Sequence, residues 1–149
     1  MKVYLIGSIH KEDDNVLEWR EKATSLILQG GGQVINPMNW DFRNISDQRN
    51  TRGIITSVSR WAVQTADVLF GRIRPIGSWG TPIEACLARE LYRKPVFGFN
   101  ANMDNTDLNP WIYEYFCFFT PEMEDAIDMM FATMKIETGS TLHYHLPRP

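Results

Sequence analysis

The regular alternation of short apolar runs with segments of helical spacing is the sequence feature that most constrains the fold of this 149-residue chain. The apolar runs predict five strands, at residues 2–6, 33–37, 67–73, 94–100 and 113–119. Between them, apolar residues recur every three or four positions, which predicts helices over 12–29, 52–65, 81–92 and from about 120 to about Lys135. Residues 38–51 lack a clear period and are predicted as a loop with some local helix.

This alternation predicts an α/β fold: one Rossmann-like or flavodoxin-like domain with a five-stranded parallel sheet and helices on both faces. Near-continuous apolar runs are typical of strands that are covered on both sides, and the expected strand order is 2-1-3-4-5. The domain is predicted to span 1–135, followed by a tail, 136–149, that is either loose or packed on a partner subunit. Ligands of such sheets bind beyond the carboxyl ends of the strands, where the strand order switches.

Composition excludes several classes of partner. The chain has 15 basic and 18 acidic residues and a net charge of −3, which argues against nucleic-acid binding. No segment approaches the roughly 20 apolar residues of a membrane helix. Cys86 and Cys117 lie in apolar runs and are predicted to be buried and reduced, as expected of a cytoplasmic protein without a signal peptide. The spacing of His10, His143 and His145 predicts no metal site, and no cofactor is expected.

The loop after the first strand is the first candidate binding segment. Its residues are Gly7, Ser8, Ile9 and His10. The glycine permits a tight turn, and the serine offers a hydroxyl and an N–H group to an anion. A plain turn between strand and helix is the alternative.

A second glycine-rich loop follows the third strand. Gly77, Ser78, Trp79 and Gly80 precede a predicted helix, and such a segment can hold a phosphate or a sugar hydroxyl. An exposed turn explains the same residues equally well.

Aromatic side chains in the predicted loops form a third set of candidates. Trp40, Phe42 and Trp79 could stack on a flat ligand such as a nucleobase. A small hydrophobic cluster outside the main core is the alternative for each of them.

Glu84 is the candidate catalytic residue. Thr81, Pro82 and Glu84 match a capping box, with the threonine at the N-cap and the glutamate three residues later. A carboxylate in the first helical turn also feels the helix dipole, which favours the ionised form. A glycosidic nucleophile must be ionised, so the capping role and the catalytic role are compatible.

Four motifs in order, "VYLIGSIH", "TADVLFGRI", "GTPIEACLA" and "RKPVFGF", resemble the nucleoside 2-deoxyribosyltransferase superfamily. That group includes nucleoside 5'-monophosphate N-glycosidases and YtoQ-like proteins, and the resemblance covers about residues 3–100. It implies a Rossmann-like domain that cleaves the N-glycosidic bond of a nucleoside or nucleotide. A glutamate at the position of Glu84 attacks the anomeric carbon, and a second base (transferase) or water (hydrolase) then takes the sugar. Asp67, in the second motif, is expected to have a structural role.

Two departures from the family pattern refine this prediction. Ser78 stands where the deoxyribosyltransferases have an aspartate. In this respect the chain resembles the N-glycosidases of 5'-monophosphates, which have serines as phosphate ligands at the positions of Ser78 and Ser8. Nucleotide hydrolysis is therefore slightly favoured. Ser59 stands where the family usually has an acid/base aspartate, so either Asp41 or Asp47 supplies the proton, or turnover is slow or absent. A non-catalytic nucleotide-binding or sensor module is the alternative function, and a flavodoxin-like electron carrier is a weaker one.

The resemblance also implies a homo-oligomer. Family members are commonly dimers or larger, and a neighbour's loop completes the site. Asn109 in "LNPWI" resembles the polar residue that such a loop contributes. The expected partners are thus a small nucleoside or nucleotide and further copies of the chain.

Overall fold

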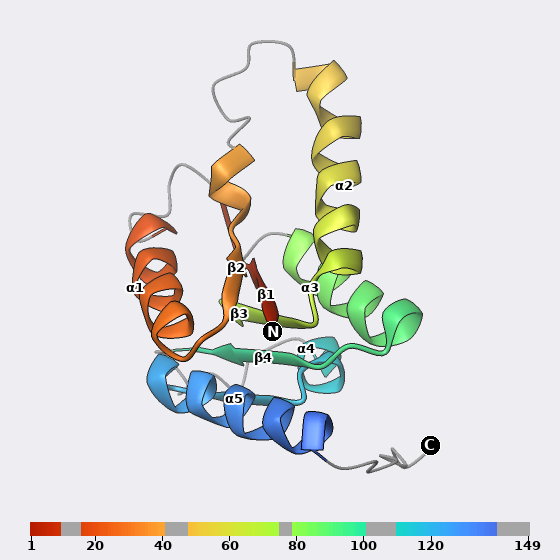
Figure 1. The fold of residues 1–149 in the computed structure, drawn as a ribbon. Helices are drawn as coiled ribbons and strands as arrows, with labels where there is room; N and C mark the ends of the chain where they lie inside the picture. Colours follow the sequence, from red (N-terminus) through yellow and green to blue (C-terminus); the bar gives the residue numbers. More distant parts are fainter. Residues whose placement is uncertain (10–15, 41–47, 75–78, 101–109, 140–149) are drawn as a thin grey trace.

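The structure is a computed structural model, and it describes residues 1–9, 16–40, 48–74, 79–100 and 110–139. Five parallel strands form one sheet in the order β2-β1-β3-β4-β5, as the sequence predicted (Figure 1). The strands are β1 (Lys2–Ile6), β2 (Gln33–Ile35), β3 (Val68–Arg72), β4 (Val96–Phe99) and β5 (Phe118–Thr120).

Helices cover both faces of the sheet. They are α1 (Val16–Gln29), α2 (Gln48–Thr65), α3 (Gly80–Cys86), α4 (Pro110–Tyr115) and α5 (Met123–Gly139), with a 3-10 turn η1 (Pro37–Trp40) and a π-helical segment η2 (Leu87–Leu91). One core lies between the sheet and α1 and α5, and the other lies between the sheet and α2 and α3. Figure 1 shows the first pair of helices on one side of the sheet and α2, α3 and α4 on the other. The described part of the chain has no helix that is both long and apolar enough to cross a bilayer.

Successive residues of a strand enter different cores. Val3 and Leu5 of β1 pack with α1 and α5, whereas Tyr4 and Ile6 pack with α2 and α3. Because both faces are buried, the strand has no polar alternation, which explains the continuous apolar runs of the sequence. The same geometry aims Tyr4 at the layer that contains α3.

The predicted strand at 113–119 is wrong in its first half. α4 extends to Tyr115, and β5 begins only at Phe118. Periodicity cannot separate a short apolar helix from a strand, and Pro110 at the first helical position is well suited to open a helix. Cys117 lies before β5, and it is exposed rather than buried as predicted; its sulfur accepts a hydrogen bond from Arg89 at 2.9 Å.

Other boundaries also differ from the prediction. β2 ends at Ile35, and Pro37, predicted as the end of that strand, opens η1 instead. α2 begins at Gln48, inside the segment predicted as a loop, and the predicted helix over 81–92 is divided into α3 and η2. α5 continues to Gly139, so the first residues of the predicted tail are helical. Residues 140–149 lie outside the described part of the chain.

Candidate functional site

Glu84 does not belong to a capping box. α3 begins at Gly80, and Trp79 occupies the N-cap position without a side-chain capping bond. Because Trp79 already has helical dihedral angles (φ −63°, ψ −20°), the helix starts before Thr81. Glu84 is therefore the fifth helical residue and lies in the second turn. Its side chain contacts the sheet.

That contact is a hydrogen bond from the tyrosine of β1. The hydroxyl of Tyr4 donates to Oε1 of Glu84 at 2.7 Å. Tyr4 is only 2% exposed, so its ring is held by the core while its hydroxyl reaches the carboxylate. Ser59 of α2 also hydrogen-bonds to both Glu84 and Tyr4. Two elements that are distant in sequence, β1 and α2, thus hold the carboxylate that α3 carries.

Burial sets the protonation chemistry of this cluster. The pKa of Glu84 is raised, mainly because its carboxyl is removed from water, although the residue as a whole is half-buried. Hydrogen bonds from Tyr4 and Ser59 and the positive charge of Arg20 partly offset that rise in pKa. The sequence placed Glu84 in the first helical turn, where the dipole favours the ionised form, but the residue lies in the second turn and burial has the largest effect on its pKa. The pKa of Tyr4 is also raised, first by burial and then by the charge of Glu84, so Tyr4 remains a donor.

The loop after β1 is shaped by a glycine that no other residue can replace without strain. Gly7 has a φ of +153°, and a Cβ atom there would lie 2.9 Å from Cζ2 of Trp19. Ser8 and Ile9 follow and are half-buried. The loop continues directly from the strand that carries Tyr4, which places it at the carboxyl edge of the sheet.

Arg20 of α1 anchors this loop from inside the protein. It has no exposed surface, and it donates hydrogen bonds to the carbonyl oxygens of Gly7 (2.9 Å) and Ser8 (3.2 Å). Its guanidinium lies 4.3 Å from the ring centroid of Trp19. Arg20 is therefore common to the loop and to Glu84, whose pKa its charge lowers.

The candidate aromatic residues have different environments. Trp40 is half-buried and packs edge-to-face against Trp61 of α2, with ring centroids 5.5 Å apart. This contact is the hydrophobic cluster that was the alternative to ligand stacking. Trp79 is 84% exposed at the start of α3, next to the exposed Gly80.

Several predicted site residues lie outside the described part of the chain. They are His10, Phe42, Gly77, Ser78 and Asn109, together with the proposed proton donors Asp41 and Asp47. Their roles stay predictions.

Sequence reasoning missed Tyr4 and Arg20, and it did not foresee the hydrogen bonds of Ser59. Tyr4 is the one hydroxyl-bearing side chain in the run "KVYLI", and a buried tyrosine hydroxyl needs a partner. Arg20 falls on the same helical face as Val16 and Ala23, which are buried, so its charge also needs a partner. Both signals are visible in the sequence.

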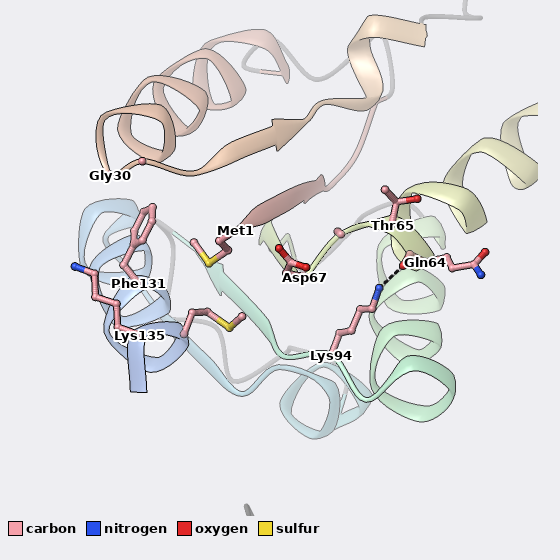
Figure 2. A pocket seen from close by; sticks show the side chains of 11 residues that line it. Met1, Gly30, Gln64, Thr65, Asp67, Lys94, Phe131 and Lys135 are labelled. Atoms are coloured by element: carbon pink, nitrogen blue, oxygen red, sulfur yellow. Dashed lines mark hydrogen bonds between the residues drawn. The ribbon is translucent and has the colours of Figure 1, made fainter. Parts of the chain in front are cut away.

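The opposite edge of the sheet contains a cavity of about 690 Å³ (Figure 2). Asp67 and Lys94 line it, and the side chains of both form hydrogen bonds with backbone groups. The N–H of Lys2 donates to Oδ2 of Asp67 at 2.6 Å, and Nζ of Lys94 donates to the carbonyl oxygens of Val63 (2.9 Å) and Gln64 at the end of α2. These contacts favour the structural role expected for Asp67.

Among the described residues, no group of three or more His, Cys, Asp or Glu side chains is placed to hold a metal ion. His10, His143 and His145 lie outside the described residues.

Comparisons with known proteins identify the fold. No protein-family model and no curated protein sequence matches the chain. Among solved structures, the chain is similar to a 2-deoxyribosyltransferase from Bacillus psychrosaccharolyticus, with a TM-score of 0.73 and 21% identity over 90% of this chain and 96% of that one. It is also similar to the CMP N-glycosidase BcmB from Clostridium botulinum, with a TM-score of 0.58 and 14% identity over 91% of this chain and 99% of that one.

A third similar structure is a CheY-like response regulator receiver domain from Methylobacillus flagellatus, with a TM-score of 0.54 and 11% identity over 90% of this chain and 98% of that one. The same fold thus occurs in N-glycosidic enzymes and in a receiver domain. The chain has the fold of the superfamily that its motifs resemble, and its function must be argued from the residues of the site.

Proposed function

We propose that the protein cleaves the N-glycosidic bond of a nucleoside or nucleoside 5'-monophosphate, with Glu84 as the nucleophile. The observation that carries the proposal is the 2.7 Å hydrogen bond by which Tyr4 holds the carboxylate of Glu84. A buried carboxylate that is oriented by hydroxyl groups is typical of a catalytic site. The similarity to a 2-deoxyribosyltransferase and a CMP N-glycosidase supports the same reaction class.

The reaction proceeds as a double displacement. An oxygen of Glu84 bonds to the anomeric carbon while the C–N bond breaks, and the electron pair of that bond leaves with the base, which takes up a proton. Water then attacks the same carbon and loses a proton, the ester bond breaks, and Glu84 regains its carboxylate. In the transferase variant, a nitrogen of a second base replaces water.

Tyr4 and Ser59 position the nucleophile in this scheme. Their hydroxyls hydrogen-bond to Glu84 and favour its ionised form against the effect of burial. Since neither hydroxyl is acidic near neutral pH, protonation of the leaving base falls to another group. Asp41 and Asp47, which lie outside the described residues, remain the proposed donors.

The substrate is proposed to be a nucleotide in preference to a nucleoside. Ser8 lies in the loop at the carboxyl edge of β1, where an anion is expected to bind. Ser78, Gly80 and Asn109 complete the predicted set of polar contacts, and Trp40 or Trp79 is proposed to cover the base. Hydrolysis is slightly favoured over transfer because the two serines resemble those of the monophosphate N-glycosidases.

A homo-oligomer is also part of the proposal. Large apolar side chains are exposed on the layer formed by α2, α3, η2 and α4, and they include Trp61, Ile83, Leu91 and Trp111, which are 49–64% exposed. Sedimentation of the wild type and of Trp111→Glu measures the assembly directly. A dimer or larger species is expected for the wild type.

A panel of nucleosides and 5'-monophosphates tests the function. Free base is measured by chromatography, with and without a second base as acceptor, so that hydrolysis and transfer are separated. Wild-type protein is expected to release base from at least one 5'-monophosphate, whereas Glu84→Gln is expected to be inactive. Equal release by both proteins would reject Glu84 as the nucleophile.

A nucleotide-binding module without catalysis is the second candidate. It is favoured by Ser59, a hydroxyl in the position where the family usually has an acid/base aspartate. Calorimetry separates the two functions, since tight nucleotide binding with no base release across the panel supports the module.

A further inference from the structure

The buried guanidinium of Arg20 hydrogen-bonds to the first residues of the loop after β1. Nη2 of Arg20 donates to the carbonyl oxygen of Gly7 at 2.9 Å, and Nη1 donates to that of Ser8 at 3.2 Å. Nη1 also donates to the carbonyl oxygen of Val16 at 3.0 Å, which ties the guanidinium to its own helix. The loop is thereby fastened to the first turn of α1.

Two consecutive carbonyls can face one guanidinium only where the chain turns. In an extended strand, successive carbonyls point to opposite sides. Gly7 departs from that geometry with a φ of +153°, and the missing side chain lets Arg20 approach, because a Cβ atom would lie 3.3 Å from Nη2. Gly7 and Arg20 therefore depend on each other, because the missing side chain of the glycine leaves the space that the guanidinium occupies.

The direction of the carbonyls also fixes the direction of the next N–H groups. A planar trans peptide places its C=O and N–H on opposite sides, and the described peptide bonds are all trans. Since the carbonyls of Gly7 and Ser8 turn toward α1, the N–H groups of Ser8 and Ile9 turn away from α1. The layer on the other side of the sheet contains Glu84. Successive N–H groups with a common direction make an anion-binding concavity.

We propose that Arg20 is a positioning residue that turns the N–H groups of Ser8 and Ile9 toward a 5'-phosphate of the substrate. The inference rests on the proposed function, in which the substrate is already a nucleotide, and deepens it by naming the residue that orients the loop for the phosphate. Arg20 itself does not touch the phosphate; it acts through the two carbonyls.

This role requires the planar set of N–H donors of the guanidinium group. Arginine presents several N–H donors in a rigid plane, whereas lysine offers a compact charge on a flexible stem. Arg20→Lys therefore keeps the positive charge and loses the simultaneous bonds to Gly7 and Ser8. Arg20→Met loses both the charge and the bonds.

The charge has a separate effect on the nucleophile. Among the described residues, Tyr4 from β1 and Ser59 from α2 hydrogen-bond to Glu84, and Arg20 from α1 acts on it through its positive charge. Each of the three lowers the pKa of Glu84. Removing the charge raises that pKa, so the acid limb of the activity profile moves to higher pH. The two arginine variants thus separate the effect of loop geometry from the effect of charge.

Kinetics with a nucleoside and its 5'-monophosphate tests the proposal. Both variants are expected to raise KM for the monophosphate about tenfold, with a smaller change for the nucleoside. Only Arg20→Met should shift the acid limb. Lys22→Met, on the exposed side of α1 where Lys22 pairs with Glu124, is the matched control and should behave as the wild type. Equal losses on both substrates, with KM unchanged, would show that Arg20 is merely structural.

A binding experiment distinguishes this inference from the proposed function. Inorganic phosphate is titrated into 15N-labelled protein, and the amide signals of Ser8 and Ile9 are followed. Shifts at these two amides in the wild type and their loss in a folded Arg20→Lys are expected. Shifts without any base release leave the positioning role standing and reject only the proposed reaction. No shift at Ser8 and Ile9 overturns the inference whatever the activity. Gly7→Ala gives a second variant if Arg20→Met does not fold, because its Cβ atom would lie 2.9 Å from Cζ2 of Trp19 and 3.3 Å from Nη2 of Arg20 and would crowd both side chains without removing a charge.

Discussion

The two edges of the sheet treat their charged groups differently. At the amino edge, Asp67 accepts from the backbone of Lys2, and Lys94 donates to the last carbonyls of α2. At the carboxyl edge, the carboxylate of Glu84 is held by the hydroxyls of Tyr4 and Ser59. The comparison teaches that the amino edge ties its side chains to the backbone, whereas the carboxyl edge holds a buried carboxylate with two hydroxyls, which is the arrangement on which the proposed reaction depends.

Exchanging the carboxylates for amides should give the largest contrast between the edges. Glu84→Gln is expected to lower kcat at least about a thousandfold, because an amide cannot form the glycosyl ester. Asp67→Asn is expected to leave kcat within about twofold, since Asp67 bonds only the start of β1 in the described contacts. Base release under saturating substrate measures both variants. Loss of activity in Asp67→Asn alone would reverse the assignment of the two edges.

Removing a hydroxyl from the carboxyl edge should have an intermediate effect. Tyr4→Phe deletes the donor at 2.7 Å from Glu84 and is expected to lower kcat/KM about tenfold to a hundredfold. The bond from Tyr4 lowers the pKa of Glu84, so its loss raises that pKa and moves the acid limb of the pH profile upward. Ser59→Ala should act in the same direction with a smaller shift. A pH profile identical to that of the wild type in both variants would contradict this account of the site.

The buried carboxylate should also reduce the stability of the fold. Burial raises the pKa of Glu84 in the folded state above its ordinary value of 4.5, so the ionised form is less favourable in the folded state. That loss of stability is absent below pH 4.5 and develops as the pH rises through the folded pKa. Glu84→Gln is therefore expected to raise Tm by about 2–4 °C at pH 7 and by less at pH 4. Calorimetric scans at the two pH values check the sign, and a lower Tm at pH 7 would refute it.

A substitution at the amino edge should change the stability of the protein without changing its activity. Lys94→Met removes the donors that close the end of α2 and is expected to reduce the free energy of unfolding by about 1 kcal/mol. Its kcat should match that of the wild type. Urea unfolding provides the measurement, and a change in the substrate KM would show that the two edges are coupled.

The sequence predicted the architecture well because both cores impose a simple pattern. Continuous apolar strands and helical periods follow directly from a sheet that is buried on both faces, so the strand order could be inferred. The failure at 113–119 has a physical cause, since a short aromatic run can pack either as a helix or as a strand. Only the tertiary contacts decide between them.

The site was predicted in part. The role of Glu84 was proposed from its motif, but the capping box was wrong, because a local pattern carries no information about Tyr4, eighty residues away in sequence. Arg20 was missed because an arginine in a helix is usually on the surface. A charge on the buried face of α1 was the signal that could have found it.

Trapping of a glycosyl-enzyme tests the central claim most directly. Wild-type protein is mixed with a cleavable 5'-monophosphate, quenched in acid within milliseconds to seconds, digested and analysed by mass spectrometry. The account predicts a peptide that contains Glu84 and carries the mass of the sugar phosphate, and it predicts no such adduct for Glu84→Gln. Base release without an adduct on Glu84, or with an adduct on another residue, would contradict the account.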